Sequence, residues 1–549
     1  MTRSHVHKYW RLVFISIFLS TILNGQSGHA EPEPQKLSAG FLQERTLDPG
    51  EEHVYVVALE EGSAVVGEAD QHGVDLVIDI FGPEGKLIRT VDSPNGLEGS
   101  EPIDLTAFTP GTYRLVIHGL DPKAKPGKYV MKVARLLTVE ENGQRMAEKN
   151  YPPALRVMWR EYVKDPKAVA RFFASRKGLG PIIEEVDGDS ENVRVTYLYY
   201  GDENTASVLA SAGPHDGSGG IQMQRFMQTP LFFASEMIPK DSRFRYGFVV
   251  SEKRFIGRDG TIQLSDDFVK DDALNPNEFN GLSVLTLPDA LPQTFSLRSN
   301  TVPRGTLTTA QLKSTFLNED RGFSIYTPAG YDGTKPADLL IIFDGESYDG
   351  GPASSIPTPT ILDNLIAAKK IAPTITLFVY DTGKRQRDLG GYKPFADFIG
   401  KELIQWARRK YRINPGPRHV VAAGSSRGGV AASHCAFVHP EAIGNVLSQS
   451  GSYWIRNGGT HLPAPLTEDS GDMVLAFRAS ERLPIRFYME VGRFEAAGLM
   501  LGTNRELRDV LMLKGYTVTY REFNSGHGYL WWRGSLADGL ITLLSDHHA

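Results

Sequence analysis

The chain has 549 residues, which is too long for one hydrophobic core, so we expect several domains. Its composition, 41% hydrophobic and 23% charged, is that of ordinary folded protein rather than of a disordered or fibrous chain. The formal net charge is −6 and no block rich in lysine and arginine occurs, which argues against nucleic acid as a partner.

Residues 1–30 have the pattern of a secretory signal peptide. Basic residues come first, an apolar run follows at residues 13–23, and small residues stand at Gly28 and Ala30. The apolar run is shorter than the roughly twenty residues that a membrane-spanning helix needs. We therefore expect cleavage before Glu31 and a periplasmic or secreted protein without a membrane span.

Short alternating strands divided by turns fill residues 36–138. Runs such as 53–59 and 113–117 are separated by turn sequences such as Asp48-Pro49-Gly50, and this spacing predicts a β-sandwich. The stretch that begins with Gly73-Val74-Asp75-Leu76 resembles the bacterial pre-peptidase C-terminal-type β-sandwich. That resemblance implies an accessory module that binds a glycan or a protein partner.

Two further segments precede the last part of the chain. Helical spacing over residues 139–182 predicts a helical connector. Residues 183–300 are again rich in β-strand patterns, as at 193–199 and 245–250. The stretch 196–250 resembles the N-terminal Ig-like domain of enterochelin esterases, which implies a second β-sandwich.

From residue 305 to 549, apolar runs alternate with helix-like stretches such as 395–410 and 505–513. Strands this apolar suit a parallel sheet that is covered on both faces. We therefore predict a multidomain protein whose C-terminal domain is an α/β-hydrolase with a doubly wound, mostly parallel sheet. The apolar runs lie at residues 339–343, 375–380, 419–423, 446–450, 485–491 and 517–520.

The pentapeptide Gly424-Ser425-Ser426-Arg427-Gly428 matches the nucleophile elbow G-x-S-x-G. It follows an apolar run and precedes a helix-like stretch, which is where the motif must lie. The register makes Ser426 the nucleophile, with Ser425 as the rival hydroxyl. We expect both flanking glycines to be required, because an elbow brings backbone segments too close for side chains.

The base and the acid should follow the nucleophile along the chain, in the order acid and then histidine. His527 lies in a glycine-flanked loop after the last apolar run and is the expected base. Glu495 follows the run 485–491, and catalytic groups gather at the carboxyl ends of such strands. Glu495 is therefore preferred as the acid, and Glu490, inside the run, remains the alternative.

An oxyanion hole needs two backbone N–H donors. The residue after the nucleophile, Arg427, is expected to supply one of them. Gly345 or Glu346, after the run 339–343, can supply the other, although a plain turn is the alternative there. Trp454 and Trp532 lie near these motifs in the sequence and are candidates for stacking on the substrate, with core packing as the competing explanation.

Several of these stretches together resemble the enterochelin esterase group of the putative-esterase (esterase D-like) superfamily. They include 340–346, 385–389, 421–429, 440–454 and 515–527. The resemblance covers about residues 190–545. It implies that Ser426, Glu495 and His527 form the triad, and that Arg387 contacts an acidic or catecholate substrate.

The sequence as a whole predicts an exported serine esterase that works through an acyl-enzyme on a small-molecule ester, foremost a siderophore ester. Alternatives are a carbohydrate-ester (feruloyl or acetyl) esterase, an acyltransferase, or a non-catalytic binding protein on a hydrolase scaffold. No cofactor is implied. No metal site is expected either, because H-E-x-x-H is absent and Cys435 is the only cysteine.

Overall fold

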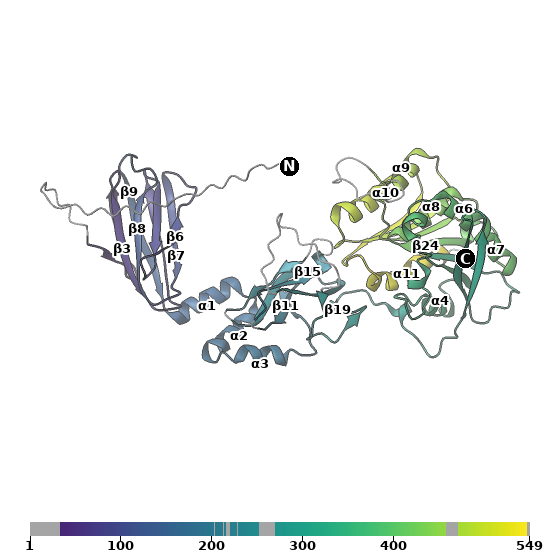
Figure 1. Ribbon diagram of the computed structural model, residues 1–549, viewed down its shortest axis with the longest axis horizontal. Coiled ribbons are helices and arrows are strands. Elements are labelled where there is room, and N and C mark those ends of the chain that lie inside the picture. The colour runs from purple at the N-terminus through teal and green to yellow at the C-terminus, as the bar shows by residue number, and fades with distance from the viewer. Residues whose placement is uncertain are drawn as a thin grey trace, which may run out of the picture. The chain divides into compact units, whose positions relative to one another are not determined.

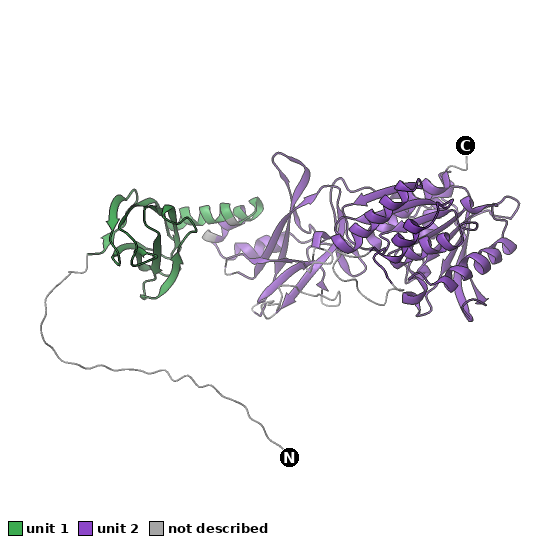
Figure 2. Cartoon of the chain, turned by 90° about the horizontal axis from the view of Figure 1, so that it is seen from above, with its two compact units in different colours: residues 1–156 green, residues 157–549 purple. Residues whose placement is uncertain are grey.

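The computed structural model describes residues 33–545 except 203, 212, 216–219, 228, 252–268 and 457–469 (Figure 1). The expected signal peptide lies outside the described residues, so cleavage and export remain predictions. Contacts divide the chain into two compact units, residues 1–156 and 157–549 (Figure 2). None of the helices described is long and apolar enough to cross a membrane.

Two sheets share one core in the first unit. One sheet has the order β1 (Gln35–Lys36), β3 (Glu52–Leu59), β8 (Gly111–Gly119), β5 (Leu76–Phe81) and β6 (Leu87–Val91). The other has the order β2 (Leu42–Leu47), β9 (Gly127–Leu137), β4 (Ala64–His72) and β7 (Glu98–Thr106). Alternate residues such as Tyr55 and Val57 of β3 meet Met131 of β9 in the core. The period-2 pattern that predicts these strands also decides which side chains are buried.

Three helices follow, α1 (Val139–Asn150), α2 (Pro153–Lys164) and α3 (Ala168–Ser175). They match the helical spacing of the sequence. Helix α1 begins at a capping box, in which the Glu141 N–H donates to Thr138 Oγ1 (3.2 Å) and the Thr138 N–H donates to Glu141 Oε2 (2.9 Å). The division between the two units falls inside α2.

The second unit begins with another pair of sheets around one core. The first has the order β10 (Ile182–Val186), β11 (Asp189–Tyr200), β15 (Leu231–Pro239) and β14 (Gln224–Arg225). The second has the order β13 (Ile221–Gln222), β12 (Ser207–Ser211), β16 (Arg243–Ser251), β19 (Leu282–Thr286) and β18 (Glu278–Phe279), and β17 (Val269–Lys270) also pairs with β16. Phe244, Tyr246 and Phe248 of β16 enter the core, so the residues between them lie on the opposite face.

The last part of the chain is built on an eight-stranded sheet. Its order is β20 (Thr306–Ser314), β21 (Glu319–Thr327), β23 (Thr374–Val379), β22 (Asp338–Phe343), β24 (Val420–Ser425), β25 (Asn445–Gln449), β26 (Arg486–Gly492) and β27 (Thr517–Phe523). The six strands from β23 to β27 in this order are parallel to one another. Strand β21 pairs antiparallel with β23 on one side and with β20 on the other. The six apolar runs of the sequence are the six parallel strands.

Helices cover both faces of this sheet (Figure 1). Leu339 and Ile341 of β22 enter one core, and Leu340 and Ile342 enter another on the opposite face. The first core includes side chains from α7 (Ile404–Lys410), α8 (Arg427–Val438), α9 (Asp472–Ala479) and α10 (Gly502–Leu513). The second includes side chains from α4 (Thr358–Ala367) and α11 (Tyr529–Leu544). Burial on both faces explains why the strands are apolar throughout.

Candidate active site

Ser426 occupies the sharp turn between β24 and α8. Its backbone has φ +55° and ψ −120°, a strained conformation for a residue with a side chain. Two hydrogen bonds hold the turn: the Ser426 N–H donates to the Gln449 carbonyl, and the Ser452 N–H donates to the Ser426 carbonyl, both at 2.9 Å. Ser426 is partly exposed, whereas Ser425, at the end of β24, is 1% exposed. The accessible hydroxyl of the elbow is therefore that of Ser426.

The glycines around Ser426 do not all have the same reason to be glycine. A Cβ on Gly424 would lie 2.6 Å from the backbone carbonyl carbon of Gly428, and a Cβ on Gly429 would lie 2.6 Å from Ser448 Oγ. A Cβ on Gly428 would meet nothing closer than 3.5 Å, which is ordinary contact. The expectation that both flanking glycines are required holds for Gly424 and is wrong for Gly428, because the backbone crowds only one side of the elbow.

His527 and Glu495 are in direct contact. His527 Nδ1 lies 2.7 Å from Glu495 Oε2. The other carboxylate oxygen, Oε1, accepts hydrogen bonds from the Gly492 N–H (2.8 Å) and from Ser450 Oγ (2.5 Å). Glu495 is 3% exposed and lies in the turn that follows β26. These bonds fix one oxygen of the carboxylate and leave the other directed at the imidazole.

Glu490, the alternative acid, lies within β26 and points into the core. Burial raises the pKa of Glu490 to about 7, although the surrounding hydrogen-bond donors lower it. The donors are Gln449 Nε2 (3.1 Å), the Tyr488 hydroxyl (3.1 Å) and the Ser535 hydroxyl. Of the two carboxylates that the sequence leaves open, the structure places Glu495 against the histidine.

The two tryptophans selected from the sequence have different surroundings. Trp532 is 3% exposed and packs edge-on against the His527 ring, with 4.8 Å between ring centroids. Its Nε1–H donates to Ser450 Oγ (3.1 Å), and Ser450 in turn donates to Glu495. Trp532 thus supports the histidine and the acid and offers little surface to a substrate. Trp454 is partly buried, and its contact with a substrate stays a prediction.

The candidate oxyanion donors lie on two segments beside the elbow. Arg427 is the first residue of α8, so its backbone N–H is at the positive end of that helix. Gly345 follows β22, after Asp344 with φ +54°, and a Cβ on Gly345 would lie 2.6 Å from the backbone of Phe378. Glycine is therefore required at position 345 for close packing against β23.

The sequence motifs do not identify Ser452, whose Oγ lies 3.1 Å from Ser426 Oγ. It is 2% exposed and follows β25, a strand adjacent to β24 in the sheet. The position after a parallel strand next to the nucleophile strand is the signal that could have identified it.

Two arginines of the turn α5 (Arg385–Asp388) have different partners. Arg387, the residue expected to contact substrate, forms ion pairs with Glu319 (3.1 Å) and Asp388 (2.7 Å). Arg385 instead makes a bidentate pair with Asp344, at 2.7 and 2.8 Å, beside Gly345. The arginine attached to the candidate oxyanion segment is therefore Arg385, and the role of Arg387 stays a prediction.

Within the described part of the chain, no group of three or more histidine, cysteine, aspartate and glutamate side chains could hold a metal ion. The chemistry that this arrangement can support is that of an activated serine, with a histidine oriented by a carboxylate and backbone donors nearby.

The chain is similar to known esterases. Residues 314–543 match the family described as Putative esterase. The iron(III) enterobactin esterase of Dickeya dadantii (strain 3937) is 28% identical over 405 residues, which cover 66% of this chain and 90% of that protein. The ferric enterobactin esterase from Salmonella typhimurium superposes with a TM-score of 0.56 at 23% identity, covering 68% of this chain and 98% of that one. The enterobactin esterase from Shigella flexneri superposes with a TM-score of 0.54 at 24% identity, covering 68% of this chain and 97% of that one.

Proposed function

This chain is an enterochelin esterase-like member of the Putative esterase family, and from that premise we propose that it is an exported serine hydrolase of siderophore esters. The contact of His527 Nδ1 with Glu495 Oε2, together with Ser426 at the strained turn, is the observation that carries the proposal. The names of the relatives support an ester of the enterobactin type as the substrate.

In the proposed mechanism, Ser426 Oγ attacks the ester carbonyl while His527 Nε2 takes its proton. Glu495 holds the Nδ1–H tautomer and stabilises the imidazolium that forms. The backbone N–H groups of Arg427 and Gly345 receive the negative charge on the carbonyl oxygen. The protonated histidine gives its proton to the leaving alcohol, and water then hydrolyses the acyl-enzyme by the same route.

We extend the proposal to compartment and architecture. The signal-like residues 1–30 support export. The eight-stranded sheet with its elbow between β24 and α8 supports an α/β-hydrolase domain. The two pairs of sheets that precede it support two β-sandwich domains.

A substrate panel tests the proposal. It contains p-nitrophenyl acyl esters, ferric and iron-free tri-catecholate siderophores, and methyl ferulate, each assayed with wild type, Ser426→Ala and Ser425→Ala. We expect the siderophore esters to have the highest kcat/KM. Ser426→Ala should lose on the order of 10³-fold or more in kcat. The neighbouring variant Ser425→Ala should keep more than about half of the wild-type kcat. A wild type inactive on every ester, or an unchanged rate in Ser426→Ala, would refute the assignment.

A further inference from the structure

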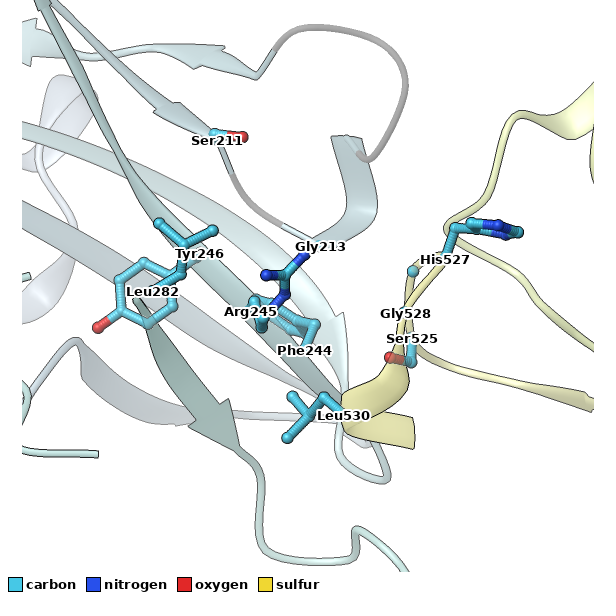
Figure 3. Close-up of a pocket in the computed structure, with 11 residues that line it drawn as sticks. Ser211, Gly213, Phe244, Arg245, Tyr246, Leu282, Ser525, His527, Gly528 and Leu530 are labelled. Atoms are coloured by element: carbon cyan, nitrogen blue, oxygen red, sulfur yellow. The ribbon is translucent and has the colours of Figure 1, made fainter. Parts of the chain in front are cut away.

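A pocket that is open to solvent borders the loop that carries His527 (Figure 3). One wall comes from the second β-rich region and includes Phe244, Arg245 and Leu282. The other wall comes from residues 525–528 and from Leu530 at the start of α11. The pocket thus joins the β-rich region to the loop of the candidate base.

Specific contacts hold the two walls together. Asn524 Nδ2 donates to Asp241 Oδ1 (2.6 Å), and the Arg243 N–H donates to the Asn524 carbonyl (3.2 Å). Phe244 packs edge-on against Phe494, the neighbour of Glu495, with 5.8 Å between ring centroids. Direct hydrogen bonds and ring packing across the gap make the pocket a fixed feature of the second unit.

Arg245 is the cationic residue of this pocket. The alternation of β16 sends Phe244 and Tyr246 into the core and leaves Arg245 on the face that borders the pocket. Arg245 is partly buried, and no described residue forms an ion pair or a hydrogen bond with its guanidinium. Partial burial of a cation costs free energy that an anionic partner offsets. A guanidinium placed in this way is suited to an anion that enters from solvent.

We propose that this pocket is a subsite for an anionic aromatic group of the substrate and that Arg245 binds the anion, an inference that rests on the proposed function. A planar guanidinium pairs with a carboxylate or a catecholate through two parallel hydrogen bonds. Leu282, which is partly buried, supplies apolar surface for the ring.

The orientation of His527 indicates which part of a substrate the subsite holds. In Figure 3 the imidazole extends away from Arg245, although the residue itself lines the pocket. The subsite therefore receives a group remote from the ester bond that is cleaved. This suits an ester with several arms, one arm at Ser426 and another at Arg245, and makes Arg245 a residue of specificity rather than of catalysis.

Calorimetric titration of the full chain tests the subsite. The parent protein is Ser426→Ala, and the probes are 2,3-dihydroxybenzoate and its neutral counterpart 2,3-dihydroxybenzamide. We expect the acid to bind the parent protein and the amide to bind at least about tenfold more weakly. Adding Arg245→Gln should weaken binding of the acid about tenfold and remove the preference, and Arg245→Lys should restore part of it.

The matched control is Lys270→Gln, which removes an exposed cation from β17, the strand paired with β16. It should leave binding of the acid unchanged. The proposal is overturned if the acid does not bind, if acid and amide bind alike, or if the glutamine variants at 245 and 270 behave alike. Because no turnover is measured, these outcomes are independent of the ester panel and leave the proposed hydrolysis standing.

Discussion

Glu490 lies within β26 and Glu495 lies in the turn that follows it, and the two carboxyl groups have different surroundings. Glu495 has hydrogen bonds that place it against His527, whereas burial in the core raises the pKa of Glu490. From the sequence, their order relative to a strand end favours Glu495 but cannot decide, because strand ends are uncertain by a few residues. The structure distinguishes them, because the turn after β26 directs the Glu495 carboxylate toward the loop of His527.

Amide substitution of each carboxyl separates these roles. Glu495→Gln keeps the size of the side chain but favours the wrong histidine tautomer, so kcat should fall on the order of 10³-fold. Glu490→Gln, the matched control, should stay within about tenfold of wild type, because its carboxyl contacts core side chains instead of His527. Steady-state kcat and KM on one p-nitrophenyl ester provide the comparison. If Glu490→Gln loses more kcat than Glu495→Gln does, the assignment of Glu495 as the acid is wrong.

Ser452 and Arg385 show why other parts of the site could not be predicted. Ser452 reaches Ser426 because β25 is next to β24 in the sheet, although the two residues are far apart in the chain. Arg385 and Arg387 belong to the same short turn, and only the position of Asp344 distinguishes them. Such contacts depend on how elements pack, which a local motif does not contain.

The turn from β24 to α8 sets the geometry of the nucleophile. The sequence around the G-x-S-x-G motif predicts the strand, the turn and the helix, because all three are formed by consecutive residues. The motif treats Gly424 and Gly428 as equivalent, yet only Gly424 lies against backbone. The structure also adds β20 and β21, neither of which contains a continuous apolar run. Strand β20 is at the edge of the sheet and exposes most of its side chains, and β21 has the polar residues Arg321 and Ser324 among its buried side chains.

Alanine substitution at the two glycines tests this asymmetry. Gly424→Ala places a Cβ 2.6 Å from backbone that cannot move without opening the elbow, so we expect a loss of about 3 kcal/mol or more in the free energy of unfolding. Gly428→Ala should change it by less than about 1 kcal/mol, because alanine also favours helix. Urea unfolding followed by circular dichroism measures both. Equal losses in the two variants would show that the crowding is not confined to one side.

The chain consists of two units with separate cores. Changes in strand and helix patterning along the sequence predict the order of the segments. The division inside α2 could not be predicted, because the helical pattern continues across it and only long-range contacts reveal it. Separate cores make it possible to measure the stability of the second unit by itself.

Tryptophan fluorescence reports on the second unit alone. Five tryptophans lie in that unit, and the sixth, Trp10, belongs to the predicted signal peptide. Buried Glu490 should make the stability of this unit depend on pH. Its pKa is about 7 in the folded unit, against an ordinary value of 4.5, so between these values the folded unit binds a proton that the unfolded chain has released.

The free energy of unfolding should therefore fall as pH rises from about 4.5 through about 7, and remain at the lower level above that. Glu490→Gln carries no titratable group, so its stability relative to wild type should increase by about 2–3 kcal/mol between pH 5 and pH 8. Urea unfolding monitored by tryptophan fluorescence at several pH values gives this difference directly. A difference that stays constant across this range would mean that Glu490 is already ionised in the folded unit at pH 5, with the three hydrogen bonds to its carboxylate outweighing burial.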